Sequence, residues 1–237
     1  MTLLSDITAN ISGIMAQSWD IVQDTSVPSD KDVTMTGRAV KLEGTVLYAD
    51  MRQSSFLAEE VSQRVAGKVY QAFLSSIGKL ISANEGTITA YDGDRIMGIF
   101  VGSTKNTSAA RCALQINHLV SKELRPRLSE QFTSLKTAGF EISHCVGIDS
   151  SSFLAVKAGQ RNANDIVWIG RAPNFAASLS EVRIENYNSF ISEDVFNAMQ
   201  ESSKYSNGDK KPMWKAFSHK YLGQDLMVYG SNWTWKF

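Results

Sequence analysis

The sequence predicts an α+β fold in which an antiparallel sheet carries its helices on one face. Between residues 41 and 200, apolar segments typical of strands alternate with amphipathic segments typical of helices, in the order β-α-β-β-α-β. The pair Asp92-Gly93 separates two of the strand segments, and Asp-Gly between such segments is the strongest short-range signal for a hairpin. This order of elements is that of the ferredoxin-like fold.

The chain divides by composition into three parts. We expect an N-terminal helix and linker over residues 1–40, a main domain over 41–205 and a C-terminal strand extension over 206–237. Apolar residues at helical spacing predict a helix over 3–19, which could pack on the domain or on a partner subunit. The polar stretch 23–36 is typical of a linker.

The main domain begins with a buried strand over residues 44–50, which ends in the carboxylate Asp50. Ser54 is a candidate N-cap for a long amphipathic helix over 56–82. The hairpin covers 86–100, and we expect Asp94 to start its second strand.

The later elements follow the same reasoning. We expect a helix over 107–128, a pair of strands over 139–148 and 152–158, and a short strand over 166–169. A short helix over 172–179, which tolerates proline in its first turn, is followed by a strand over 189–192 and a helix over 194–201. The segments 213–221 and 226–235 are expected to form a terminal hairpin.

Composition limits the possible functions. The chain has 237 residues, 43% of them hydrophobic, and no net charge, which argues against nucleic-acid binding. No apolar run approaches the ~18 residues of a membrane span, and no secretory signal is visible, so a cytoplasmic location is expected. The single cysteines Cys112 and Cys145, and the histidines His118, His144 and His219, lack partners at metal-ligand spacing and are interpreted as structural.

Asp50 and Asp94 are the candidate catalytic carboxylates. Either residue alone is explained by loop or turn chemistry. Together they end neighbouring strands at the centre of the predicted sheet, where two carboxylates repel each other unless a cation lies between them. Mg²⁺ or Mn²⁺ prefers such oxygen ligands, and two-ion sites use them to stabilise attacking and leaving oxygens.

The residues after Asp50 are candidates for phosphate binding. Ser54 and Ser55 precede a predicted helix, and free N–H groups at a helix N-terminus can hold phosphate. The alternative is an ordinary helix start without a ligand.

Three motifs make the chain similar to a known family. Residues 46–55 read VLYADMRQSS, residues 90–100 read AYDGDRIMGIF and residues 168–179 read WIGRAPNFAASL. They resemble the first metal motif, the second metal motif and the later Gly-x-x-x-Asn-x-Ala segment of class III nucleotidyl cyclases. The resemblance covers roughly residues 41–200.

The resemblance implies specific roles. Asp50 and Asp94 would bind two Mn²⁺ or Mg²⁺ ions, with the carbonyl of Met51 as a further ligand. It implies a class III cyclase homology domain that forms a head-to-tail homodimer, in which the metal-binding aspartates of one subunit meet Asn174 of the other.

The departures from the family pattern concern the base and the transition state. Purine cyclases of this class carry Lys where this chain has Ala90, and Asp or Thr where it has Val167. The transition-state Arg or Lys is replaced by Ser178, and Arg171 or Lys220 could substitute for it. Candidate residues for nucleotide binding are therefore Tyr91, Trp168 and Arg171, besides Ser54 and Ser55.

The Tyr-Asp-Gly-Asp form of the second motif resembles the pyrimidine cyclases of the bacterial anti-phage system called Pycsar. The resemblance implies conversion of UTP to 3′,5′-cyclic UMP and pyrophosphate, as a second messenger that acts on a separate effector in antiviral defence. The alternatives are a cytidylate cyclase making cyclic CMP, an adenylate or guanylate cyclase, and a catalytically dead nucleotide-binding module. Neither nucleic-acid nor membrane binding is expected.

Overall fold

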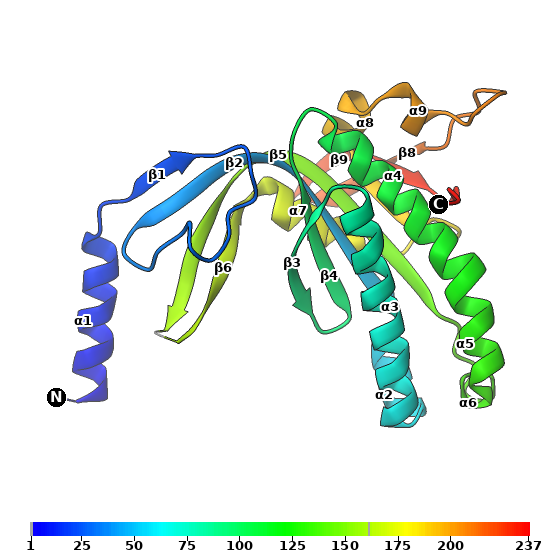
Figure 1. The fold of residues 1–237 in the computed structure, drawn as a ribbon, viewed down its shortest axis with the longest axis horizontal. Coiled ribbons are helices and arrows are strands. Elements are labelled where there is room, and N and C mark those ends of the chain that lie inside the picture. The colour runs from blue at the N-terminus through cyan, green and yellow to red at the C-terminus, as the bar shows by residue number, and fades with distance from the viewer. Residues whose placement is uncertain (1, 161) are drawn as a thin grey trace.

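The computed structural model describes residues 2–160 and 162–237. Its strands form one nine-stranded sheet in the order β3-β4-β2-β5-β7-β9-β8, with β1 paired to β2 and β6 paired to β5 (Figure 1). The strands are β1 (Asp20–Gln23), β2 (Arg38–Arg52), β3 (Thr87–Asp92), β4 (Arg95–Phe100), β5 (Ser143–Gln160), β6 (Ala163–Gly170), β7 (Ser189–Ser192), β8 (Lys215–Tyr221) and β9 (Gln224–Ser231).

The helices connect and cover these strands. They are α1 (Leu3–Ala16), α2 (Ser54–Glu60), α3 (Gln63–Ala83), α4 (Lys105–His118), the π-helix η1 (Leu119–Leu124), α5 (Arg125–Gln131), α6 (Thr133–Thr137), α7 (Arg171–Ser180), α8 (Glu193–Ala198) and α9 (Glu201–Lys204). Among the described residues, none of these helices is long and apolar enough to cross a membrane.

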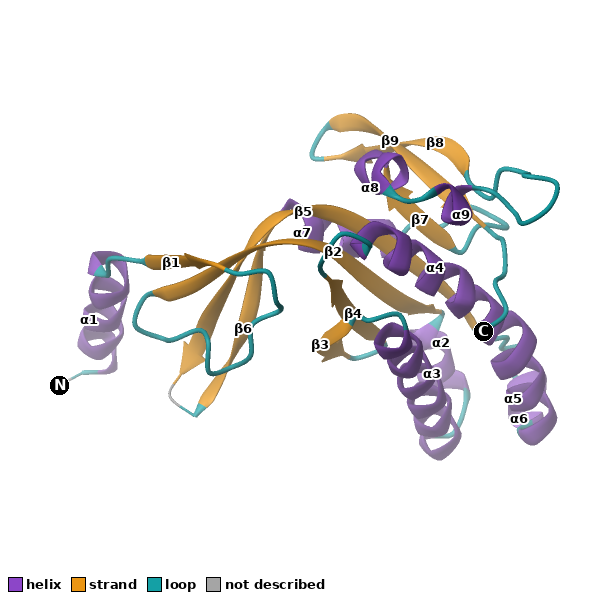
Figure 2. Ribbon diagram, turned by 45° about the horizontal axis from the view of Figure 1, so that its top comes forward, coloured by secondary structure: helices purple, strands orange, loops and turns teal. Residues whose placement is uncertain are grey.

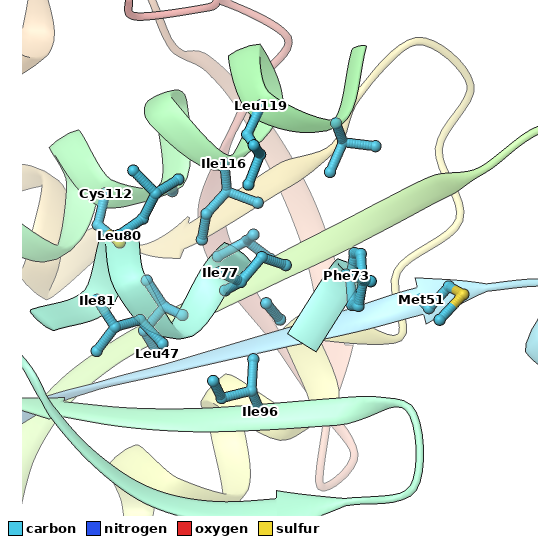
Figure 3. Close-up of a cluster of buried hydrophobic side chains, with 14 of the residues drawn as sticks. Leu47, Met51, Phe73, Ile77, Leu80, Ile81, Ile96, Cys112, Ile116 and Leu119 are labelled. Atoms are coloured by element: carbon cyan, nitrogen blue, oxygen red, sulfur yellow. The ribbon is translucent and has the colours of Figure 1, made fainter. Parts of the chain in front are cut away.

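The predicted ferredoxin-like fold is confirmed. The order β2-α3-β3-β4-α4-β5 folds into the antiparallel strand order β3-β4-β2-β5. Helices α3 and α4 cover one face, where Leu47, Phe73, Ile77 and Ile116 pack in one apolar cluster (Figure 3). Each large apolar side chain buried there contributes about 1.5–3 kcal/mol.

Helix α7 packs on the opposite face of the sheet, so the helices are not confined to one face (Figure 2). A Cβ atom at Gly147 of β5 would lie 2.1 Å from the carbonyl oxygen of Ala176 in α7. Only glycine allows the helix backbone to approach the strand this closely. This contact fixes the position of α7 over β5.

The central strands β2 and β5 are longer than predicted. They pair from Val40 with Ala155 to Arg52 with Ser143 without interruption. The expected pair of strands over 139–158 is wrong, because the serines at its centre are part of the ladder, where Ser150 Oγ also donates to the carbonyl of Gly44. Strand β2 begins at Arg38 and therefore runs across the boundary drawn at residue 41.

Both long helices are interrupted. The helix predicted over 56–82 is divided into α2 and α3, which meet at Val61 and Ser62. Ser54 is the first residue of α2 and not its N-cap; Gln53 is the N-cap, with φ at 60°. The helix predicted over 107–128 changes from α4 to η1 and then to α5.

The hairpins form where they were expected, with one shift. Asp92 pairs with Arg95, so the turn residues are Gly93 and Asp94, and Gly93 adopts φ of 59°. Asp94 therefore lies in the turn and not in β4, one residue from its predicted place. The terminal hairpin is confirmed, with Tyr221 paired to Gln224.

The N-terminal segment forms an arm. Helix α1 ends at Ala16 and has no buried residue, and it lies at the far end of the sheet from α3 and α4 (Figures 1 and 2). The polar stretch expected as a linker includes the end of β1, which pairs in parallel with β2, and the buried Val33. We conclude that this stretch is integrated into the fold.

We predict that His144 makes the stability of the fold sensitive to acid. Burial lowers the pKa of this imidazole to about 3, and the charges of Arg52 and Arg125 act in the same direction. As the pH falls below about 6.5, His144 therefore binds a proton in the unfolded chain but not in the folded protein. We expect the unfolding free energy to fall by about 2 kcal/mol between pH 8 and pH 5 through this residue alone.

The measurement is urea unfolding across this pH range for the wild type and for His144→Leu. The variant should be less stable at pH 8, because the substitution disturbs a packed site, but its stability should depend less on pH. Equal slopes in the two proteins would contradict the assignment.

Candidate active site

Asp50 lies at the centre of the sheet, two residues before the end of β2. It pairs with Arg95 of β4 on one side and with Cys145 of β5 on the other. Side chains alternate along a strand, so Ala49 and Met51 enter the core beneath α3 while Asp50 points to the opposite face. Only 5% of Asp50 is exposed.

Asp94 reaches the same place from the turn between β3 and β4. Its carbonyl accepts a hydrogen bond from the backbone N–H of Met51 at 3.3 Å, which fastens the turn to the end of β2. Asp50, Met51, Asp94, Ser54 and Ser55 all line one polar cavity of about 500 Å³, together with Gln53, Arg95, Glu181 and Arg183. We call this the carboxylate cavity. The structure thus brings together five of the residues predicted from the sequence.

Two arginines compensate the buried carboxylate. Arg183 Nη2 donates to Asp50 Oδ2 at 2.9 Å, and Arg95 Nε lies 3.4 Å from Asp50 Oδ1. Arg95 Nη2 also pairs with Glu181 Oε1 at 3.0 Å. None of these three residues was predicted from the sequence as a partner of Asp50. Arg95 follows Asp94 directly inside a motif, but Glu181 and Arg183 lie beyond α7 in a segment without any signal.

The electrostatics of Asp50 combine opposing effects. Burial raises the pKa of this carboxyl group above its usual range, and the negative charge of Asp94 raises it further. The hydrogen bond from Arg183 and the charge of Arg95 lower it. A carboxylate in this position requires positive charge beside it.

The donor set of the carboxylate cavity fits a hard divalent cation. Two carboxylates and the carbonyl of Met51 offer only oxygen, and the open, polar cavity leaves room for waters and phosphate oxygens. Within the described residues, no group of three or more His, Cys, Asp or Glu side chains could hold a metal ion.

A second cavity of about 290 Å³ lies beside the first. Strand β6 and the first turns of α7 form one wall and the β3–β4 hairpin forms another, and its lining is Tyr48, Ala90, Asp92, Arg95, Met97, Ile166, Val167, Trp168, Pro173, Asn174 and Ala177. We call this the tryptophan cavity. Arg95 lines both cavities. Trp168 packs edge-on against Phe153 at 5.9 Å between ring centroids.

Two residues predicted to bind the nucleotide lie elsewhere. Tyr91 pairs with Ile96, and its hydroxyl lies over Gly78 of α3, on the sheet face opposite to Asp50. It is 57% exposed and lines neither cavity. The difference arises because neighbouring residues of a strand point to opposite faces, so Ala90 reaches the tryptophan cavity and Tyr91 does not.

Arg171 is engaged in holding α7 to the sheet. Its guanidinium donates to both carboxylate oxygens of Asp149 at 2.9 and 3.0 Å, and it also pairs with Asp194. Asp149 is fully buried, and burial raises the pKa of its carboxyl group against the opposing effects of Ser192 and Arg171. Arg171 lines neither cavity, and its ion pairs connect α7 to the sheet.

The position of the usual transition-state arginine is occupied by a hydrogen-bonded pair. Ser178 Oγ lies 3.3 Å from His219 Nε2 of β8. Lys220 is exposed and lines neither cavity. Neither of the two cations named as substitutes, Arg171 and Lys220, lines one of the two cavities.

Comparison with known proteins agrees with this geometry. The chain is 35% identical over 232 residues to a uridylate cyclase of Rhodovulum sp. (strain MB263), covering 98% of this chain and 97% of that protein. It is also 35% identical over 237 residues to a uridylate cyclase of Xanthomonas perforans, covering 100% and 99%. No protein-family model matches the chain.

Among solved structures, the guanylyl cyclase Cya2 shares the fold with a TM-score of 0.67 and 16% identity, covering 82% of this chain and 93% of that one. The relatives share sequence over the full chain, and the two motif aspartates meet in one cavity on the fold of such cyclases. The chain therefore belongs to the family of class III nucleotidyl cyclases that includes these uridylate cyclases.

Proposed function

We propose that this enzyme converts UTP to 3′,5′-cyclic UMP and pyrophosphate with the help of two Mn²⁺ or Mg²⁺ ions. The observation that carries the proposal is the convergence of Asp50 and Asp94 in the carboxylate cavity. The tryptophan cavity, in turn, lacks the purine-reading residues. The 35% identity to proteins named uridylate cyclase supports the choice of base.

The reaction is an in-line displacement at the α-phosphorus by the 3′-oxygen of the ribose. Divalent ions supply acidification of the 3′-hydroxyl and shielding of the phosphates. Asp50, Asp94 and the Met51 carbonyl hold these ions, and the hydroxyls of Ser54 and Ser55 donate to phosphate oxygens. Positioning and electrostatics supply most of the rate enhancement in such phosphoryl transfers.

The tryptophan cavity is the proposed site for the base. Ala90 and Val167 stand where purine cyclases carry their base-reading side chains, and Trp168 narrows the space that remains. Tyr48, Asp92 and Arg95 offer polar groups in the same cavity. A site that hydrogen-bonds one base edge discriminates strongly against other bases. CTP is the alternative pyrimidine substrate.

We infer that the active enzyme is a head-to-tail homodimer. In this arrangement the tryptophan cavity of one subunit, with Asn174 placed to orient the ribose, faces the carboxylate cavity of the other. The exposed apolar side chains of Val167 and Ile169 on β6 support a protein contact at this edge. Each complete site then requires two chains.

The cellular role follows from the resemblance to the Pycsar cyclases. We propose that the cyclic nucleotide is a second messenger in antiviral defence, which acts on a separate effector protein. The second candidate function is a nucleotide-binding module without activity, and Ser178 in place of the transition-state arginine favours it. The following experiment separates the two.

We predict that purified protein with Mn²⁺ forms cyclic UMP from UTP and that Asp50→Asn lowers the rate at least about 100-fold, since it removes a metal ligand. Mass spectrometry of products from each of the four nucleoside triphosphates is the measurement. Arg127→Gln, a change on the far surface of α5, is the control and should keep full activity. Lack of product from all four nucleotides favours the inactive module, and cyclic AMP as main product excludes the pyrimidine assignment.

We predict that two inactive variants restore activity together. Asp50→Asn and Asn174→Ala should each be inactive, but their heterodimer contains one intact site. Co-expression at equal levels should recover about a quarter of the wild-type activity, because half of randomly paired dimers are heterodimers with one site of two. No recovery would place both residues in a site made by one chain.

We predict that Trp168→Ala raises the KM for UTP roughly tenfold, because it opens the tryptophan cavity. The same change should reduce the ratio of kcat/KM for pyrimidine nucleotides to that for purine nucleotides. Comparing kcat/KM for all four nucleotides tests this. Tyr91→Phe is the matched change on the opposite face of the hairpin and should leave the order of substrates unchanged. If Tyr91→Phe changes the order of substrates, Tyr91 does belong to the base site.

A further inference from the structure

We propose that Arg183 is a mobile counter-ion that occupies the metal site of the free enzyme and moves to the triphosphate when the metal-bound nucleotide enters. This inference rests on the proposed function, because it assigns the metal site to Asp50. It names a positioning residue that no motif of the sequence indicates.

The first observation is that Arg183 occupies one oxygen of the carboxylate that is proposed to bind the metal ion. Arg183 Nη2 donates to Asp50 Oδ2 at 2.9 Å, and Asp50 is 5% exposed. A carboxylate buried to this extent is costly without a cation, so the arginine stabilises the free protein. A divalent ion that coordinates Asp50 through Oδ2 competes with this hydrogen bond.

The second observation is that the Arg183 side chain is half exposed on the segment after α7, whereas Arg95 belongs to the sheet itself. Arg183 belongs to the segment that follows α7, and its side chain is 47% exposed. Its other bonds are to the carbonyls of Ser180 and Val182, close to its own place in the chain. Arg95 lies in β4 and is fixed by Glu181 as well as by Asp50.

The third observation is the charge balance of the carboxylate cavity. Its lining includes three carboxylates, Asp50, Asp94 and Glu181, and two guanidinium groups, Arg95 and Arg183. A divalent ion between the aspartates repels the neighbouring guanidinium, and a triphosphate in the same cavity attracts it. A guanidinium can pair with phosphate oxygens through two parallel hydrogen bonds.

The consequence is a coupling between the two ligands. Without nucleotide, Arg183 competes with the metal for Asp50, so the free enzyme binds metal weakly. With nucleotide, the phosphates take up the arginine and release the carboxylate. Metal and nucleotide therefore increase each other's affinity, as thermodynamic linkage requires.

The test uses Arg183→Gln in the full-length protein. We expect nucleotide-free Arg183→Gln to bind Mn²⁺ roughly tenfold more tightly than the wild type, because the competing cation is gone. We also expect its KM for UTP with Mn²⁺ to rise roughly tenfold, because a phosphate contact is lost. Electron paramagnetic resonance of free Mn²⁺ gives the first quantity and initial-rate kinetics give the second.

Matched variants exclude a general effect of lost charge. Arg127→Gln removes a guanidinium that pairs with Glu123 on the surface and should change neither quantity. Arg183→Lys keeps the charge without the planar fork and should give intermediate values of both. Thermal unfolding of each variant confirms that it is folded before titration.

The opposed directions of the two effects distinguish this role from a structural one. A residue that only supports the site would weaken both metal and nucleotide binding when it is changed. An unchanged or weakened Mn²⁺ affinity, or an unchanged KM, in Arg183→Gln overturns the proposal. If the proposed function is wrong, the wild-type protein will form no cyclic nucleotide. The Mn²⁺ titration still decides in that case whether Arg183 competes for Asp50.

Discussion

The burial of a charged carboxylate at the centre of the sheet is the constraint on which this structure depends. Asp50 stands between β4 and β5, where most side chains are apolar. Arg183 and Arg95 supply the compensating charge in the free protein. The hairpin turn that carries Asp94 is tied to the same strand end through Met51. The geometry of the site thus follows from the need to compensate one buried charge.

The long central strands connect this site to the rest of the molecule. Strand β2 carries Asp50 and Tyr48 on the face that α7 covers, and β5 pairs with it from Val40 to Arg52. Because α7 rests directly on Gly147, the segment after the helix brings Arg183 back to Asp50. Arg95 of β4 lines both the carboxylate cavity and the tryptophan cavity.

Much of the fold and part of the site could be predicted from the sequence, because local patterns determine them. The Asp-Gly pair predicted the hairpin, and the places of Asp50 and Asp94 at the ends of neighbouring strands predicted their meeting. The ion pair of Asp50 with Arg183 could not be predicted, since it joins residues 133 positions apart without a motif. The serines of β5 are typical of a loop, and only their pairing with β2 makes them a strand. The position of Tyr91 was open to prediction, since alternation along β3 places it opposite to Ala90.

The contact at Gly147 also determines how such an enzyme can evolve. Any side chain there would collide with the backbone of α7 at Ala176. A substitution of Gly147 would therefore force the helix away from the sheet. The walls of the tryptophan cavity are under no such restriction, because Ala90, Val167 and Trp168 contribute side chains and not backbone packing to it. If the tryptophan cavity holds the base, as proposed, single substitutions in its walls would change the nucleobase of the messenger and leave the contact between α7 and the sheet unaltered.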